Sequence, residues 1–100
     1  MDRVNLEMCR AIAEKVRRKP SLMRIARRNL SRWKKKVRPW PRALREWEGI
    51  MDRNSLERVL EILTQDNDEG QRLRQSDPFI GILSERERLL FLGLNEQIAA

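Results

Sequence analysis

Apolar residues recur at intervals of three and four along almost the whole chain, which is the spacing of one face of an α-helix. Glycine is scarce, no strand-length run alternates apolar and polar residues, and the helix-favouring Leu, Glu, Arg and Ala dominate. We therefore predict an all-α fold, a single compact bundle of five to six short helices, over residues 1–100.

Prolines and capping residues divide this pattern into helical segments. Prolines at positions 20, 39 and 41 flank the second segment, because the residue before a proline avoids helical geometry. Ser21 is predicted to be the N-cap of that segment, and Asn54–Glu57 and Ser84–Glu87 have the spacing of capping boxes. The predicted segments are residues 3–18, 21–37, 40–51, 54–63, 68–75 and 84–97.

The positive charge is concentrated in the front half of the chain. The chain contains 22 Lys and Arg residues and 15 Asp and Glu residues, which gives a net charge of +7. Residues 1–50 carry 16 basic and 5 acidic side chains, whereas residues 51–100 carry 6 and 10. A basic front half and a mildly acidic back half indicate a polyanionic or acidic partner for the front half.

The sequence lacks the groups that most enzymes use. It contains no His and no Tyr, and its single cysteine, Cys9, has no acid–base neighbour in the pattern. We predict that Cys9 is a buried core residue, that the chain is not an enzyme and that it needs no cofactor.

The acidic stretch DNDEG does not have the spacing of a calcium loop. Counted from Asp66, its glycine stands at the fifth place instead of the sixth, and the twelfth place, Asp77, is not glutamate. We therefore predict no metal site.

No apolar run approaches the roughly 18 residues that a membrane-spanning helix needs. Because the N-terminal residues also lack a signal-peptide pattern, we expect a cytoplasmic protein with no membrane partner.

The second segment is the main candidate for a binding surface. Its apolar residues fall on one side of a helix, and no acid stands between Arg24 and Arg42. Three interpretations are open: a solvated face, a surface for the phosphates of DNA or RNA, and a surface for an acidic protein. A solvated face ordinarily uses Glu–Lys pairs four residues apart, which are missing here. The candidate residues are Arg24, Arg27, Arg28, Lys34, Lys35, Lys36 and Arg38.

The three tryptophans offer base-stacking platforms in principle. Trp33 and Trp47, however, are in phase with the apolar residues of their segments, so we predict that both belong to the core. Trp40, between two prolines, is the remaining candidate for an exposed contact with a partner.

The C-terminal part contains two apolar features with two interpretations each. Phe79 and Ile80 follow a turn proline and are candidate anchors for a partner, although Phe79 could equally fill the end of the core. In the last segment, Leu89 to Leu94 surround more than half of the helix. Such a helix is either central in the core or covered on one side by a second chain, either a copy of this protein or another protein.

The stretch RLRQSDPFIGILSERER carries a distinctive combination of residues. It begins with a Leu-Arg-Gln and continues with a Pro-Phe, a small residue and an aliphatic pair, before a helix start of alternating acidic and basic residues. The residues that make up this combination are Leu73, Arg74, Gln75, Pro78, Phe79, Gly81, Ile82 and Leu83. Upstream, IARRNLSRW and LREWEGIMDRNSLERVLEIL add a helix with a basic patch, a Trp-centred helix and a Leu-rich helix. Over about residues 10–92 this pattern resembles the small helical antitoxin-like proteins of bacterial toxin–antitoxin pairs, which are encoded beside nucleotidyltransferase-like toxins.

The resemblance implies a cytoplasmic protein that neutralises a toxin encoded by a neighbouring gene and that can also repress its own operon. It supplies no site residues, and Asp77 stands where the pattern has serine or asparagine. From the residues themselves we expect a non-catalytic binding protein, with a toxin-like enzyme as the first partner and DNA or RNA as the alternative. A homo-oligomer through the last segment also remains open.

Overall fold

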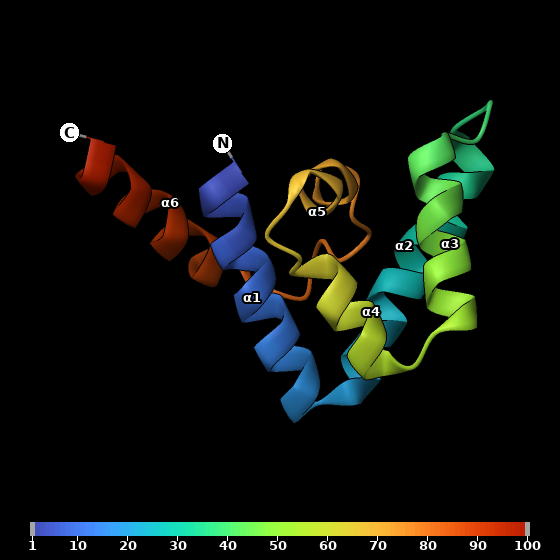
Figure 1. Ribbon diagram of the computed structural model, residues 1–100, viewed down its shortest axis with the longest axis horizontal. Helices are drawn as coiled ribbons and strands as arrows, with labels where there is room; N and C mark the ends of the chain where they lie inside the picture. The colour runs from blue at the N-terminus through green and yellow to red at the C-terminus, as the bar shows by residue number, and fades with distance from the viewer. Residues whose placement is uncertain (1, 100) are drawn as a thin grey trace.

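The computed structural model describes residues 2–99, with side chains for residues 3–93, and all regular secondary structure in this range is helical (Figure 1). The predicted all-α globule is confirmed, with a radius of gyration of 13.7 Å. The helices are α1 (Asp2–Arg18), the 3-10 helix η1 (Pro20–Leu22), α2 (Met23–Lys36), α3 (Arg42–Arg53), α4 (Leu56–Leu63), α5 (Asp68–Arg74) and α6 (Glu85–Ala99).

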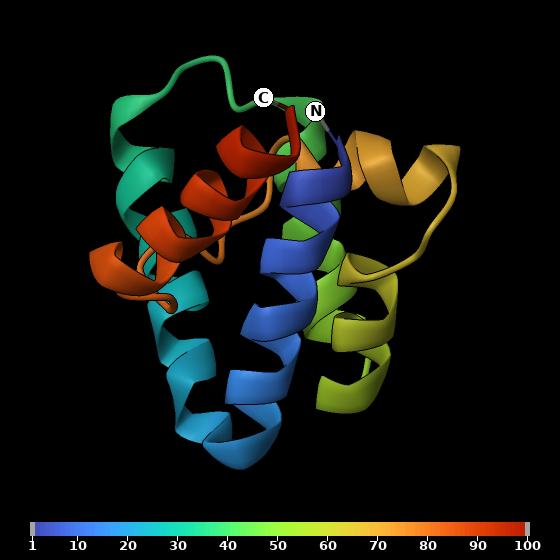
Figure 2. The same cartoon turned by 90° about the vertical axis from the view of Figure 1, so that its left-hand side faces the viewer.

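Helix α1 is the element against which most of the others are arranged. It packs against α4, α5 and α6, and α4 in turn packs against α3 and α5. Helices α2 and α3 lie side by side at one end of the molecule, and α6 lies at the other end, beyond α1 (Figures 1 and 2). The basic helix α2 and the apolar helix α6 are therefore both on the outside of the globule.

Trp47 of α3 is at the centre of the core. Its side chain is fully buried, and its ring meets Phe79 edge to face, with 5.5 Å between the ring centroids. The indole Nε1 donates a hydrogen bond to the carbonyl oxygen of Leu73 at 3.0 Å. Trp47 thus joins α3, α5 and the turn before α6, and the predicted burial of Trp47 and of Cys9 is confirmed.

Arg74 is the one buried charged residue among the described side chains, with 1% of its surface exposed. Its Nη1 donates to the carbonyl oxygens of Leu63, at 3.1 Å, and Gln65, at 2.5 Å. Leu63 is the last residue of α4 and Gln65 lies two residues beyond it, at the end where the helix dipole is negative. Thr64 and Gln65 bond the carbonyls of the preceding turn, and the guanidinium supplies the donor for the Leu63 and Gln65 carbonyls.

Gly70 allows α5 to approach that helix end. A Cβ built on Gly70 would lie 2.1 Å from the carbonyl oxygen of Gln65, so any larger residue would push α5 away from α4. Asn67 begins α5 as its N-cap, accepting a hydrogen bond from the Gly70 N–H at 2.7 Å.

Two predicted N-caps are wrong by one or two residues. Ser21 lies inside η1, because Pro20 begins a helical turn early and the Met23 N–H bonds back to the Pro20 and Ser21 carbonyls. At α4 the cap is Ser55, which accepts from the backbone N–H of the third helical residue. Asn54 instead ends α3, with its Nδ2 donating to the Ile50 carbonyl at 2.8 Å.

The predicted capping box at the start of α6 is confirmed. The Ser84 N–H donates to Glu87 Oε1 at 2.8 Å, and the Glu87 N–H donates to Ser84 Oγ at 3.1 Å. Glu87 Oε1 also accepts a hydrogen bond from the ammonium of Lys15 at 2.8 Å, and the same ammonium donates to the Ile82 carbonyl oxygen at 2.8 Å. These bonds hold the pKa of Glu87 down at about 2 and attach the first turn of α6 to α1.

The last predicted segment corresponds to α6, and the interpretation that it is a central core helix is wrong: several of its described leucine side chains are exposed. Leu89, Leu90 and Leu92 are 57%, 63% and 40% exposed. The reason is that α6 packs chiefly against α1, so its outer side has no covering element. Leu94 lies outside the described side chains. No helix in the described range has the length and apolar composition needed to cross a membrane.

We expect Arg74→Met to lower the free energy of unfolding by about 3 kcal/mol, because it leaves buried carbonyl groups without a donor. Urea denaturation measures the change. Arg72→Met is the matched control, since Arg72 is two residues away and its ion pairs with Glu46 and Glu69 are at the surface, so its loss should be much smaller. Equal losses in the two variants would contradict the capping role of Arg74.

Asp77 makes stability depend on pH. Burial raises the pKa of Asp77 to about 6, against the opposing effects of the hydrogen bond from the Phe79 N–H and the charge of Arg74. The folded state therefore binds this proton more tightly than the unfolded chain, and the associated stability, full below pH 4, is lost as the pH rises to about 6.

We expect Asp77→Asn to raise the free energy of unfolding by about 1 to 2 kcal/mol at pH 7.5 and to change it little at pH 4. Asparagine keeps the oxygen that accepts from Phe79 but never ionises. Urea denaturation at both pH values tests this, with the exposed Asp66→Asn as control. A gain of the same size at pH 4 would show that ionisation is not the cause.

Candidate functional site

The cations of α2 form two groups. Arg27 and Lys34 point toward α3: Arg27 pairs with Asp52 at 3.1 Å and donates to the Met51 carbonyl at 3.0 Å. Lys34 pairs with Glu48 at 3.2 Å. The remaining cations are exposed and make no ion pair with any described residue: Arg24, Arg28, Arg32, Lys35, Lys36 and, just after the helix, Arg38.

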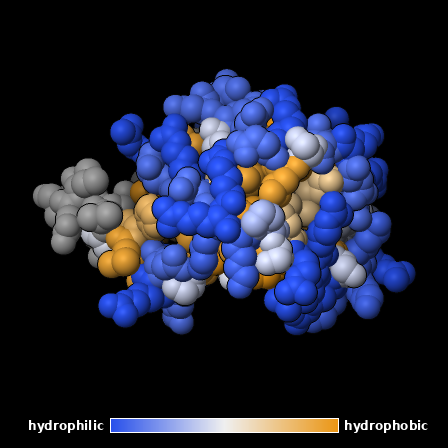
Figure 3. Space-filling view, turned by 90° about the horizontal axis from the view of Figure 1, so that it is seen from below, coloured by the Kyte–Doolittle hydropathy of each residue, from blue (hydrophilic) through white to orange (hydrophobic). Residues whose placement is uncertain are grey.

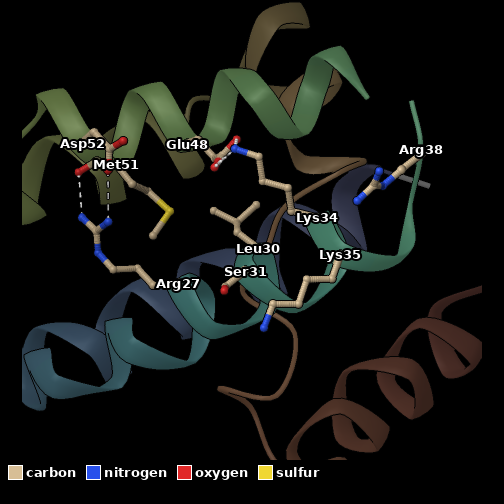
Figure 4. A pocket seen from close by; sticks show the side chains of 9 residues that line it. All are labelled: Arg27, Leu30, Ser31, Lys34, Lys35, Arg38, Glu48, Met51 and Asp52. Carbon is tan, nitrogen blue, oxygen red and sulfur yellow. Dashed lines mark hydrogen bonds and ion pairs between the residues drawn. The ribbon is translucent and has the colours of Figure 1, made fainter. Parts of the chain in front are cut away.

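The first group spans a shallow groove between α2 and α3 (Figure 4). The Arg27 and Lys34 side chains cross it to reach α3, and Leu30 and Met51 form its apolar floor between them. Lys35 points away from α3, to the side of α2 on which α6 lies. The two acids of α3 thus neutralise one flank of α2 and leave the other flank without a counter-charge.

We call the unneutralised row Arg24, Arg28, Arg32 and Lys35 the α2 cation stripe. The three arginines are four residues apart and therefore neighbours on one face of the helix. The buried residues Ala26 and Leu30 are on the opposite side. Like charges at this spacing repel by a few tenths of a kcal/mol per pair, so the stripe opposes the folding of its own helix. An anion from outside the chain would remove that repulsion.

The structure changes the list of candidate cations in two ways. Arg24, Arg28, Lys35, Lys36 and Arg38 are exposed as predicted, whereas Arg27 and Lys34 are already engaged by α3. Arg32 was missing from the predicted set, although its position four residues after Arg28 is the signal that identifies it.

Trp40 is half-buried and its polar atom is occupied. The indole Nε1 donates to Glu48 Oε1 at 2.6 Å, and the ammonium of Lys34 lies 6.0 Å from the ring centroid. Trp33 is also half-buried and packs against the core. Both rings contribute to the packing of this end of the molecule.

Of the two candidate anchors in the turn, only Ile80 is accessible. Phe79 is fully buried against Trp47, so an anchoring role for Phe79 is wrong and the alternative, a core residue, is confirmed. Ile80 is 61% exposed. Asn29 of α2 donates to the carbonyl oxygens of Pro78 and Ile80, each at 2.8 Å. These bonds place an exposed apolar side chain beside α2.

The surrounding surface is largely hydrophilic. In Figure 3, which shows the face seen from below, blue side chains cover most of the surface, and apolar side chains show between them in the middle and at the left end, where α6 lies. In the described part of the chain, no group of three or more His, Cys, Asp or Glu residues is placed to hold a metal ion. The chemistry that this surface offers is charge pairing and apolar contact.

No protein-family model, no curated protein and no solved structure matches this chain.

We expect the triple variant Arg24→Gln, Arg28→Gln, Arg32→Gln to keep or slightly raise the free energy of unfolding at low salt, because it removes repulsion and no ion pair. The gain, a few tenths of a kcal/mol, should vanish at 0.5 M NaCl, where surface charges are screened. Urea denaturation at both salt concentrations measures it.

The matched control is Arg27→Gln, Lys34→Gln, which removes the two contacts with α3 and should lower stability slightly. A clear loss of stability in the triple variant would mean that the stripe is needed for folding.

Proposed function

We propose that this chain is a non-catalytic, antitoxin-like cytoplasmic protein. It neutralises a partner enzyme of the nucleotidyltransferase or ribonuclease type by binding an acidic surface of that enzyme through the α2 cation stripe. The observation that carries the proposal is that the stripe has no counter-charge within the described chain, although acids of α3 neutralise the other flank of the same helix.

The neighbourhood of the stripe favours a protein over a nucleic acid as partner. Protein interfaces combine arginines with apolar anchors, and Ile80, 61% exposed, is fixed beside α2 by Asn29.

The mechanism follows from the chemistry of such enzymes. Enzymes that handle nucleotides or RNA position metal ions and substrates with carboxylates, so their sites have acidic rims. Guanidinium groups pair with carboxylates in a planar, two-pronged geometry. Arginines in a row along one rigid helix would cover such a rim and exclude the substrate.

A DNA- or RNA-binding regulator is the second candidate. Its support is the regular spacing of Arg24, Arg28 and Arg32, which follows a line along which successive phosphates could be contacted. This function would show as a steep fall of affinity with rising salt, and duplex DNA and tRNA are the probes that test it.

The test of the first proposal is growth rescue. We expect expression of the neighbouring gene alone to arrest growth, and co-expression of this chain to relieve the arrest. Arg24→Glu, Arg28→Glu, Arg32→Glu should abolish the rescue and weaken binding to the purified neighbour at least about a hundredfold, since each reversal replaces an attraction by a repulsion.

The matched control carries the same change in net charge at exposed cations outside the stripe: Lys19→Glu, Arg45→Glu, Arg53→Glu. This control should rescue growth. Full rescue by the stripe variant would refute the proposal. If the neighbour is not toxic and the wild-type chain binds DNA or tRNA with a steep salt dependence that the stripe variant loses, the second candidate takes its place.

A further inference from the structure

A hollow of about 360 Å³ lies at the corner where the chain turns from α1 into α2, at the lower end of the molecule in Figures 1 and 2. Its volume is within the range of small-molecule sites, roughly 300 to 1,000 Å³. We call it the corner hollow, and six residues line it: Lys19, Ser21, Leu22, Arg24, Ile25 and Arg28.

The backbone of the corner brings these side chains to one place. The Lys19 carbonyl accepts a hydrogen bond from the Leu22 N–H at 3.0 Å, which turns the chain from the end of α1 into η1. Ser21, Arg24 and Arg28 then follow at intervals of three and four residues, so they share one face of the helical segment. Side chains from both sides of the turn therefore border on the same space.

The charge at the corner hollow is entirely positive. Lys19, Arg24 and Arg28 are exposed, and none of them makes an ion pair with a described residue. No acid lines the hollow among the residues that the structure describes. The first turns of η1 and α2 also contain no acid, so the positive end of the helix dipole is not offset there.

The acids of the adjoining helices do not supply a counter-charge. Glu14, near the end of α1, pairs with Arg18 at 3.3 Å. Glu85, at the start of α6, lines no part of the hollow and pairs with none of its cations. Within the described range, three cations thus border one hollow without a carboxylate among them.

These groups match a phosphate better than a carboxylate. A phosphate monoester carries close to two negative charges at pH 7, and its three terminal oxygens are strong acceptors. A carboxylate carries one charge and is satisfied by a single guanidinium. The corner hollow offers two guanidinium groups, an ammonium and the hydroxyl of Ser21. Leu22 and Ile25, both half-buried, add apolar surface for the organic part of an ester.

We propose that the corner hollow binds the terminal phosphate of a phosphomonoester. Arg24 and Arg28 pair with the phosphate oxygens, Lys19 adds a third positive charge and the Ser21 hydroxyl donates a hydrogen bond. The same group occurs on a free mononucleotide and at the phosphorylated 5′ end of a nucleic-acid strand, and the experiment separates these two sources. The proposal does not rest on the function proposed above.

The test is isothermal titration calorimetry of the full-length chain at low salt, where surface charges are least screened. We expect AMP to bind and adenosine, which lacks the phosphate, to bind at least about tenfold more weakly. A 5′-phosphorylated hexanucleotide should likewise bind at least about tenfold more tightly than its unphosphorylated form. If the phosphorylated strand binds tighter than AMP, a strand end is the natural source; otherwise it is the free mononucleotide.

Two variants with the same loss of net charge separate the hollow from the rest of the basic surface. The hollow variant should lower AMP affinity at least about tenfold, because it removes every cation at the site. It carries Lys19→Gln, Arg24→Gln and Arg28→Gln. The matched control should lower affinity less than about threefold, because its cations lie elsewhere on α2. It carries Arg32→Gln, Lys35→Gln and Lys36→Gln.

Ser21→Ala changes no charge and removes only the hydroxyl donor. We expect it to lower AMP affinity about threefold, the size of one lost hydrogen bond. Circular dichroism and urea denaturation should show that all three variants fold as the wild type does.

Three results would overturn the proposal. They are no binding of AMP at millimolar concentration, equal losses in the two triple variants, and equal binding of the phosphorylated and unphosphorylated strands. The second would mean that overall charge attracts the ligand, and the third that the chain contacts the strand backbone. The proposed function fails by a different result, growth rescue with the stripe variant, so the two failures are distinguishable.

Discussion

The buried guanidinium of Arg74 is the contact on which the arrangement of the C-terminal half depends. It occupies the carbonyl groups at the end of α4, and thereby allows that end to be covered by α5 without an unsatisfied backbone group. With α5 in place, the Leu73 carbonyl receives the indole of Trp47, and Phe79 closes the core against the same ring. The turn that follows is then held where Asn29 can bind it.

Helical spacing and local capping chemistry were enough to predict most of the fold. The bounds of α1, the burial of Trp47 and the reciprocal bonds of Ser84 and Glu87 depend on residues close in sequence, and all three are confirmed. What the pattern could not indicate is the burial of Arg74, because a charged residue in an amphipathic segment is ordinarily exposed. The exposure of α6 could not be predicted either. An apolar helix has the same residue pattern whether its outer side is covered by the same chain or left exposed.

The candidate surface was predictable as a region, but its division was not. The absence of acids from Arg24 to Arg42 locates the basic helix, yet it says nothing about acids far along the chain. Asp52 and Glu48 come opposite Arg27 and Lys34 only because α3 folds back beside α2. Tertiary structure therefore divides one basic segment into a neutralised flank and an unneutralised one.

The two hydrogen bonds of Asn29 have a consequence for affinity. They fix the Ile80 backbone relative to α2 before any partner is present, so the turn loses little freedom when it is covered. Association is weakened by the conformational entropy of whatever must become ordered, and here that loss has already occurred during folding. The surface is preorganised: a rigid spacing between an apolar point and a row of charges selects partners by the geometry of their own rim as well as by its charge.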